Sequence, residues 1–199
     1  MFYDPRNGHG LPHDPFKAIV APRPIGWIST VNSRSENNIA PYSFFAPVSG
    51  NPPMLMFSSE GRKDSMLNAE ETGEFVFNLS TLSLSAEMNQ TAASVGPEVD
   101  EFELAKLETA PCVNVRPLRV AASPAAMECK VLGVQRLADL NGVQTDRYLV
   151  IGQVVGVHIN EDYLVEGLFD TAKAQPLARC GYLNDYAAAT EIFAIKRPG

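Results

Sequence analysis

Short runs of apolar and β-branched residues, separated by turn residues, dominate the chain and predict strands. Two of these runs, at 126–137 and 146–159, flank Asn141-Gly142, a dipeptide that favours tight hairpin turns. The run at 74–80 is apolar on both faces, which indicates a central strand of a sheet. The other predicted strands are 16–21, 25–31, 39–45, 54–59, 163–165 and 192–195.

Helical patterns are confined to a few short segments. Residues 66–72 predict a helix that ends at Gly73, because glycine readily adopts the left-handed conformation that closes a helix. Residues 83–93 carry apolar residues at helical spacing, and residues 170–174 predict a single helical turn.

The balance of these elements predicts the fold class. Strands outnumber helices and do not alternate with them, so we expect a mainly β protein, an antiparallel barrel with a few short helices. The chain has 199 residues, 15 of them proline and 14 glycine, which suits one domain over 1–199 built from short elements. Residues 1–15 predict an irregular N-terminal arm, and residues 46–53 predict a loop.

Charge and cysteine content exclude several classes of protein. The net charge of −7 argues against nucleic acid as the main partner. We find neither an apolar run long enough to span a bilayer nor the apolar segment of a signal peptide near Met1. Cys112, Cys129 and Cys180 are an odd number without close pairing, which is typical of reduced thiols, with Cys129 as a core residue. We therefore predict a cytoplasmic protein without a membrane partner.

Hydroxyl and amide side chains stand inside or beside the apolar runs at Ser29, Thr30, Asn38 and Ser43. Buried polar groups need hydrogen-bond partners. These partners are either backbone groups within the barrel or a polar ligand that lies on the strands. For any single residue of the four, the backbone is the commoner partner.

A basic turn precedes the predicted helix at 66–72. Arg62 and Lys63 stand where the helix dipole favours negative charge. A bound phosphate would remove this conflict, since free N–H groups, two cations and the Ser65 hydroxyl together form an anion site. The alternative is an exposed basic turn with no ligand.

Several familiar motifs are absent from the sequence. It contains no GxGxxG and no Walker loop, so it does not predict a Rossmann or P-loop nucleotide site. It also contains no HExxH and no paired CxxC, so we expect no metal site. His158 stands alone at the end of a predicted strand, which indicates a structural role.

The ordered segments PRPIGWISTVN, NIAPYSFF, SSEGRKDS and GEFVFNL resemble the flavin reductase-like family of FMN-binding split β-barrels. Flavoredoxin-type proteins and the small reductase components of two-component monooxygenases belong to that family. The later segments Asp100-Glu101-Phe102, SPAAMECKV and PLARCGYLNDYA fit it as well, so the resemblance extends from about Phe16 to Pro198. The resemblance implies a Greek-key-like antiparallel split barrel.

By this resemblance, FMN lies against the first hairpin, with NADH or NADPH as co-substrate. The flavin supplies the redox chemistry, so no side chain is expected to act as a catalytic acid or base. The cofactor-binding residues that the resemblance implies are Trp27, Ile28, Ser29, Thr30, Asn38, Ala40, Pro41, Tyr42, Ser43, Ser58, Arg62, Lys63, Asp64, Ser65, Arg179 and Tyr182.

The resemblance leaves three functions open. The protein is an NAD(P)H-dependent flavin reductase, a flavoredoxin-like carrier that passes electrons to a protein partner, or a flavin-binding protein without turnover. A monooxygenase or another redox protein is the partner that the first two functions imply. The family also implies a homodimer, which Trp27 and Phe44 would favour if a lone barrel leaves them unburied. In such a dimer Arg179 lies near the flavin, or else it pairs with a carboxylate in its own chain.

Overall fold

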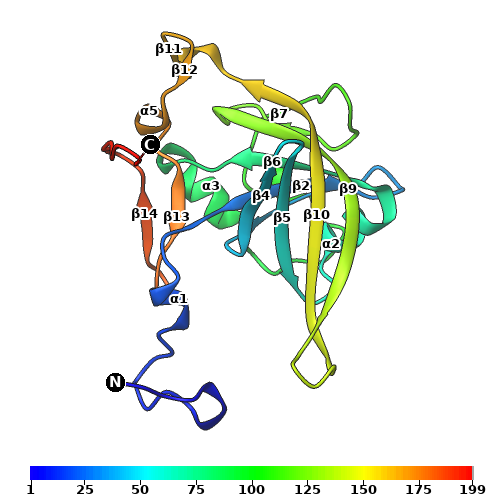
Figure 1. The fold of residues 1–199 in the computed structure, drawn as a ribbon. Helices are drawn as coiled ribbons and strands as arrows, with labels where there is room; N and C mark the ends of the chain where they lie inside the picture. The colour runs from blue at the N-terminus through cyan, green and yellow to red at the C-terminus, as the bar shows by residue number, and fades with distance from the viewer. Residues whose placement is uncertain (199) are drawn as a thin grey trace.

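The computed structural model describes residues 1–198, and its centre is a seven-stranded antiparallel sheet that curls into a barrel (Figure 1). The strand order β3-β2-β6-β9-β10-β5-β4 places β6 and β9 in the middle. This architecture confirms the predicted mainly β class. The strands are β2 (Gly26–Val31), β3 (Asn37–Tyr42), β4 (Phe45–Gly50), β5 (Pro53–Glu60), β6 (Glu74–Leu79), β9 (Ala125–Ala138) and β10 (Gln144–Ile159).

Smaller elements surround the barrel. The chain ends form a three-stranded sheet in the order β1-β13-β14, which lies to one side of the barrel in Figure 1. Its strands are β1 (Arg23–Pro24), β13 (Leu177–Arg179) and β14 (Tyr186–Ala188). Two further sheets have two strands each: β7 (Thr109–Ala110) pairs with β8 (Arg119–Val120), and β11 (Leu164–Val165) pairs with β12 (Leu168–Phe169). The α-helices are α1 (Phe16–Ile19), α2 (Asp64–Thr72), α3 (Ser85–Gln90), α4 (Glu101–Leu104) and α5 (Thr171–Ala174), and the 3-10 helices are η1 (Pro5–Asn7), η2 (Leu82–Leu84) and η3 (Glu161–Tyr163).

The first hairpin separates two apolar cores because side chains along a strand alternate between its faces. Ile28 of β2 joins the core inside the barrel, together with Phe57 and Phe75. Trp27, the preceding residue, joins a second core on the other face with Phe102. Every residue of β2 is therefore buried, and the strand is fixed from both sides.

Three predicted elements differ from the structure. Residues 16–21 predict a strand, but most of them form the short helix α1. Residues 46–53 predict a loop, but most of them form β4, an edge strand in which prolines are tolerated. The predicted strand at 192–195 is absent, and β14 is the last strand among residues 1–198.

The predicted exposure of Trp27 is also wrong. Its side chain has no exposed area, and its indole Nε1 donates a hydrogen bond of 2.9 Å to Thr91 Oγ1. Phe44, by contrast, remains 44% exposed. Among the described residues, no helix combines the length and the hydrophobicity needed to cross a bilayer.

Candidate functional site

A buried polar network joins the first hairpin to α2. Thr30 Oγ1 and Ser65 Oγ both donate to Asn38 Oδ1, at 3.2 and 2.7 Å. Asn68 Nδ2 donates to Thr30 Oγ1 at 3.1 Å. The structure thus brings together three of the predicted site residues, and their polar groups bond to one another. The network holds the start of α2 against β2 and β3.

Glu101 of α4 completes this network. Its two carboxylate oxygens accept from Asn38 Nδ2 at 3.0 Å each, and one of them accepts from the Ile39 N–H at 3.2 Å. Burial raises the pKa of Glu101, although the N–H of Ile39 acts in the opposite direction. Sequence reasoning missed Glu101 and Asn68 as members. The spacing of Ser65 and Asn68, three residues apart on one helix, was an available signal for Asn68.

The entry of α2 lacks a side-chain cap. Helix α2 begins at Asp64, two residues before the predicted start, and Lys63 is its N-cap residue. Lysine offers no acceptor to the first N–H groups of a helix, and no side chain caps them here. Lys63 is exposed and has no ion-pair partner among residues 1–198. Free N–H groups and a free cation therefore meet at one place.

Arg62 is balanced by the chain itself. Its guanidinium pairs with Glu70, which lies further along α2, at 2.8 Å, and both side chains are exposed. The same guanidinium lies over the ring of Tyr148, 5.7 Å from its centroid. The ion pair with Glu70 raises the pKa of Arg62. An anion at this turn would compete with Glu70 for Arg62 but would meet no competitor at Lys63.

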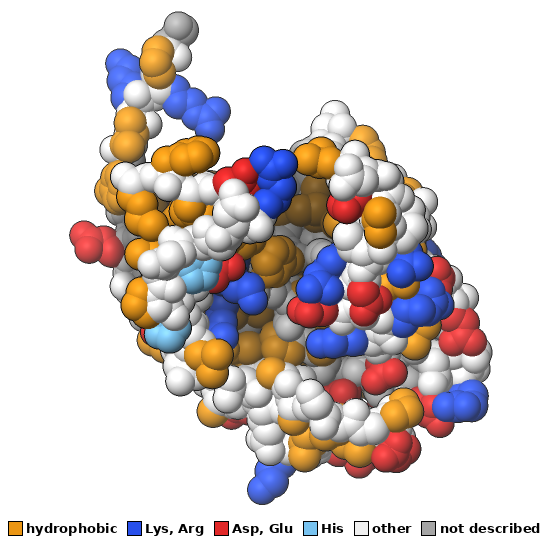
Figure 2. All heavy atoms as spheres, turned by 90° about the horizontal axis from the view of Figure 1, so that it is seen from below, with side chains coloured by type: hydrophobic (Ala, Val, Ile, Leu, Met, Phe, Trp, Pro, Cys, Tyr) orange, Lys and Arg blue, Asp and Glu red, His pale blue; other side chains and the backbone are white. Residues whose placement is uncertain are grey.

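Half-buried residues extend this turn into a surface that a ligand could contact. Ala40 and Pro41 lie near the end of β3, Ser43 follows that strand, and Ser58 lies on β5, which pairs with β4. The Ser58 N–H donates to the Phe44 carbonyl at 2.8 Å, which places Ser58 beside the two residues that join β3 to β4. Figure 1 shows β5 running towards the lower end of the molecule, and Figure 2 shows that end hollowed, with Lys and Arg side chains along the hollow.

Other predicted residues lie on faces that the chain itself covers. Ser29 is fully buried, donates to the Leu118 carbonyl at 2.6 Å and accepts from Asn78 Nδ2 at 3.1 Å. Ile28 is packed inside the barrel. Tyr42 packs against Phe57 with ring centroids 4.8 Å apart, and burial raises its pKa. The Ser29 hydroxyl thus bonds to a backbone carbonyl, the kind of partner that the sequence analysis gives as the commoner one.

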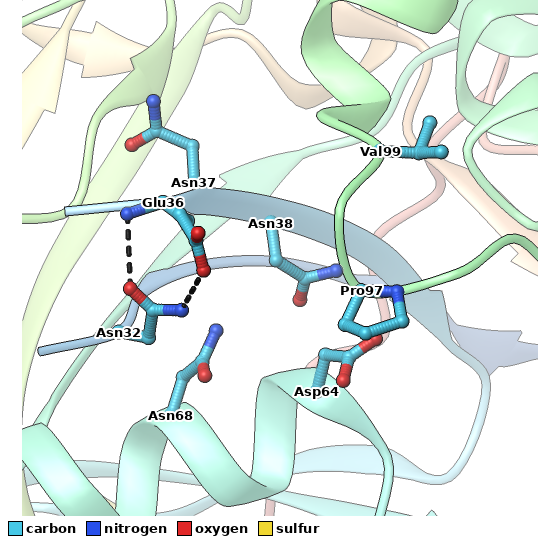
Figure 3. A pocket seen from close by; sticks show the side chains of 8 residues that line it. All are labelled: Asn32, Glu36, Asn37, Asn38, Asp64, Asn68, Pro97 and Val99. Carbon is cyan, nitrogen blue, oxygen red and sulfur yellow. Dashed lines mark hydrogen bonds between the residues drawn. The ribbon is translucent and has the colours of Figure 1, made fainter. Parts of the chain in front are cut away.

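A polar pocket adjoins the buried network, and Asp64, the residue that follows Lys63, forms part of its lining. Figure 3 shows Asp64 directed towards Pro97 and the amides of Asn38 and Asn68 facing the same space. Two carboxylates, those of Glu36 and Asp64, line this pocket, and no Lys or Arg does. Such a lining repels a phosphate, so within this part of the molecule an anion is favoured at the Lys63 side of the helix start. Asp64, a predicted site residue, is therefore placed where it would repel a phosphate and not bind it (Figure 3).

The two predicted tail residues lie in or beside the three-stranded sheet. Arg179 Nη2 donates to the Leu183 carbonyl at 2.6 Å, and its guanidinium lies over the Tyr186 ring, 4.5 Å from the centroid. Among residues 1–198 it forms no ion pair, so of the two alternatives for Arg179 the carboxylate partner within the chain is absent. Tyr182 is 49% exposed and contacts the ring of His13, with centroids 5.7 Å apart.

Comparison with known proteins finds relatives that match most of the chain in sequence and in structure. An uncharacterised protein of Bacillus subtilis, YwrF, is 35% identical over 185 residues, which cover 90% of this chain and 89% of the relative. The crystal structure of nitrilotriacetate monooxygenase component B from Bacillus cereus superposes with a TM-score of 0.87 at 31% identity and 98% coverage of both chains. The 2-nitrobenzoate 2-nitroreductase NbaA of Pseudomonas fluorescens superposes with a TM-score of 0.81 at 25% identity, covering 92% of this chain and 88% of that one.

A family model described as flavin reductase like domain matches residues 20–177. The matched range contains the whole barrel, helix α2 and the basic turn before it. The resemblance seen in the sequence is therefore confirmed: the protein belongs to the flavin reductase-like family.

Proposed function

We propose that this protein binds FMN and acts as an NAD(P)H-dependent flavin reductase. Family membership supports a flavin as the ligand. The likeness to a monooxygenase component B, at 31% identity over nearly the full length of both chains, supports a reductase that serves a separate oxygenase. The observation that carries the proposal is the uncapped start of α2 with Lys63 at its N-cap.

The residues at this turn fit a flavin phosphate. The free N–H groups at the start of α2 and the cations of Lys63 and Arg62 would bind the phosphate oxygens. The network through Asn38 fixes the helix start in advance, which reduces the ordering cost of binding. Ala40, Pro41, Ser43 and Ser58 offer the half-buried surface for the rest of the cofactor.

A bound flavin would supply the redox chemistry, as the acceptor of a hydride from a reduced nicotinamide. The tasks left to the chain are binding, orientation and exclusion of water. Hydride transfer leaves no proton for a side chain to remove from the nicotinamide carbon, so no catalytic base is required there, and the proton that the reduced flavin takes up would come from solvent. Arg179, which lies over Tyr186 without a carboxylate partner among residues 1–198, is our candidate for a contact to the nicotinamide or flavin.

The test is to purify the full chain, record its visible spectrum, and follow the oxidation of NADH and of NADPH with and without added FMN. Rapid oxidation that requires free FMN supports the reductase. Tightly held FMN without such turnover would instead support the electron carrier or the non-catalytic flavoprotein. Failure to bind FMN at micromolar concentration would overturn the proposal as a whole.

We further propose that the protein forms a homodimer. The long hairpin exposes apolar side chains at alternate positions of β10, which share one face: Val155 at 38%, Val157 at 55% and Ile159 at 44%. Clustered exposed apolar surface of this kind marks protein contacts. Light scattering should give about twice the mass of one chain, and Val157→Asp should shift that mass towards the monomer. A wild-type protein that is monomeric at high concentration would refute the proposal.

A further inference from the structure

Three side chains of the kinds that bind metals converge outside the flavin-site residues. Cys112 comes from the connector between β7 and β8, Glu128 from β9 and His158 from the end of β10. Their sulfur, oxygen and nitrogen atoms all lie within 4.8 Å of one another. His158 therefore does not stand alone as the sequence suggested, because the fold places it in contact with Glu128, 30 residues earlier in the chain.

Glu128 is the centre of this cluster. It has no exposed area, and His158 Nε2 lies 2.5 Å from its Oε1. The N–H groups of Val113 and Asn114 donate to Oε1 and Oε2 at 2.7 and 2.6 Å. These two donors directly follow Cys112 in the chain, so they fix the loop that presents the thiol to the carboxylate.

The backbone also makes room for the carboxylate. Gly156 faces Glu128 across the β9–β10 ladder. A Cβ at that position would lie 3.1 Å from Glu128 Cδ, a tighter approach than side chains normally make. The glycine therefore leaves the space that the buried carboxylate occupies, and hydrogen bonds to a carboxylate of this kind are the usual support of a metal ligand.

From this convergence we propose that Cys112, Glu128 and His158 form a binding site for a divalent transition metal ion, with Zn²⁺ as the favoured occupant. A thiolate, an imidazole and a carboxylate are the three ligand types of tetrahedral zinc sites. Zinc bonds of about 2.0–2.3 Å place tetrahedral ligand atoms roughly 3.3–3.6 Å apart. The site needs shifts of about 1 Å to reach that spacing, with the ion replacing the proton between His158 and Glu128.

Three protein ligands would leave the fourth position of a tetrahedral zinc ion for water or a small anion. His158 lines a cavity that it shares with Arg119, Ser123 and Asn160. In the single chain this cavity, which Val157 and Ile159 also line, gives an ion a route to the imidazole. The bound ion together with a thiolate and a carboxylate carries no net charge, so the partly buried position of the site does not oppose binding.

Two other roles for the cluster are distinguishable from metal binding. A nucleophilic Cys112 is disfavoured, because without a bound cation its half-buried thiol lies beside the Glu128 carboxylate, which opposes a free thiolate. A bound Zn²⁺ would supply the missing positive charge and displace the thiol proton. A purely structural role, in which Glu128 only fastens the connector and His158 to the barrel, explains the hydrogen bonds but gives the thiol no task. The experiment must therefore separate loss of metal from loss of structure.

The test titrates Zn²⁺ into the chelator-treated, reduced full chain in competition with a chromophoric chelator, and repeats the titration with Co²⁺. We expect one ion per chain at submicromolar affinity and a sulfur-to-cobalt charge-transfer band. Cys112→Ala and His158→Gln should each weaken Zn²⁺ binding at least about 100-fold, and Cys112→Ala should abolish that band. Cys180→Ala removes the other half-buried thiol and should change neither.

Thermal unfolding of the same proteins controls for the fold. Zn²⁺ should raise the melting temperature of the wild type and of Cys180→Ala, but not that of Cys112→Ala, which should fold normally without metal. The proposal is overturned if the wild type binds less than one ion per chain at micromolar Zn²⁺. It is equally overturned if a folded Cys112→Ala variant binds Zn²⁺ as tightly as the wild type. Neither result depends on flavin binding.

Discussion

Replacing Lys63 with alanine should weaken FMN binding while leaving riboflavin binding nearly unchanged. Lys63 is the N-cap residue of α2 and has no ion-pair partner among residues 1–198, so its charge is available to a phosphate. Riboflavin lacks the phosphate and therefore never makes the contact. The difference between the two ligands isolates the phosphate from the rest of the flavin site.

The expected magnitude follows from the surroundings of the two cations. A charge-assisted contact contributes on the order of 1.5–3 kcal/mol, which corresponds to about 10- to 100-fold in affinity. Because Lys63 is exposed, solvent screening places its effect near the lower value. Arg62 must first leave Glu70, and exposed ion pairs are worth about 0.2–1 kcal/mol. Glu70→Gln should therefore strengthen FMN binding by up to about fivefold.

The assay is a fluorescence titration of FMN and riboflavin against wild type, Lys63→Ala, Arg62→Ala and Glu70→Gln at two salt concentrations. The loss in the cation variants should shrink at high salt, since screening already weakens the contact in the wild type. Lys173→Ala removes a lysine of α5, away from the basic turn, and controls for the change in net charge.

Two results would refute this reasoning. Equal losses for FMN and riboflavin in Lys63→Ala would mean that the substitution damaged the fold. No change for either ligand would mean that the turn is a solvated basic loop and that the phosphate lies elsewhere. An unchanged affinity in Glu70→Gln would remove only the argument that Glu70 competes for Arg62.

Three further predictions concern stability, each measured by denaturant or thermal unfolding. Gly26→Ala should destabilise the protein by about 1–3 kcal/mol, because the new Cβ would lie 2.4 Å from Phe45 Cδ2; no loss would show that Phe45 moves freely. Glu101→Ala should cost roughly 2–4 kcal/mol, since it orphans two buried donors, and a loss below about 1 kcal/mol would contradict that account. Burial alone would raise the pKa of Glu74, but Lys130 and the N–H of Arg116 lower it below its ordinary value. The ionised carboxylate therefore stabilises the fold at neutral pH, and this stabilisation is lost as the pH falls through the lowered pKa. Glu74→Gln should flatten that acid dependence, and an unchanged slope would contradict the assignment.

The sequence by itself determined the fold class, most strands and the family. Alternation of apolar residues is a local property, so the printed sequence is enough to predict β2, β5, β6, β9 and β10. The same reasoning fails at β4, where Pro47 indicates a loop. That strand forms because β5 pairs with it, and the local conformational preferences of residues do not specify such pairing at the edge of a sheet.

Tertiary structure alone decided which polar residues face one another. The sequence singled out Thr30, Asn38 and Ser65, but not Glu101, which lies 63 residues beyond Asn38 and satisfies its amide. The same holds for His158, a lone histidine in the sequence that the β9–β10 register brings to Glu128. Local sequence sets the periodicity of an element and the chemistry of its side chains. Which buried polar groups share a site is set only by the packing of elements that are distant in the sequence, because each buried polar group needs a hydrogen-bond partner from wherever the fold supplies one.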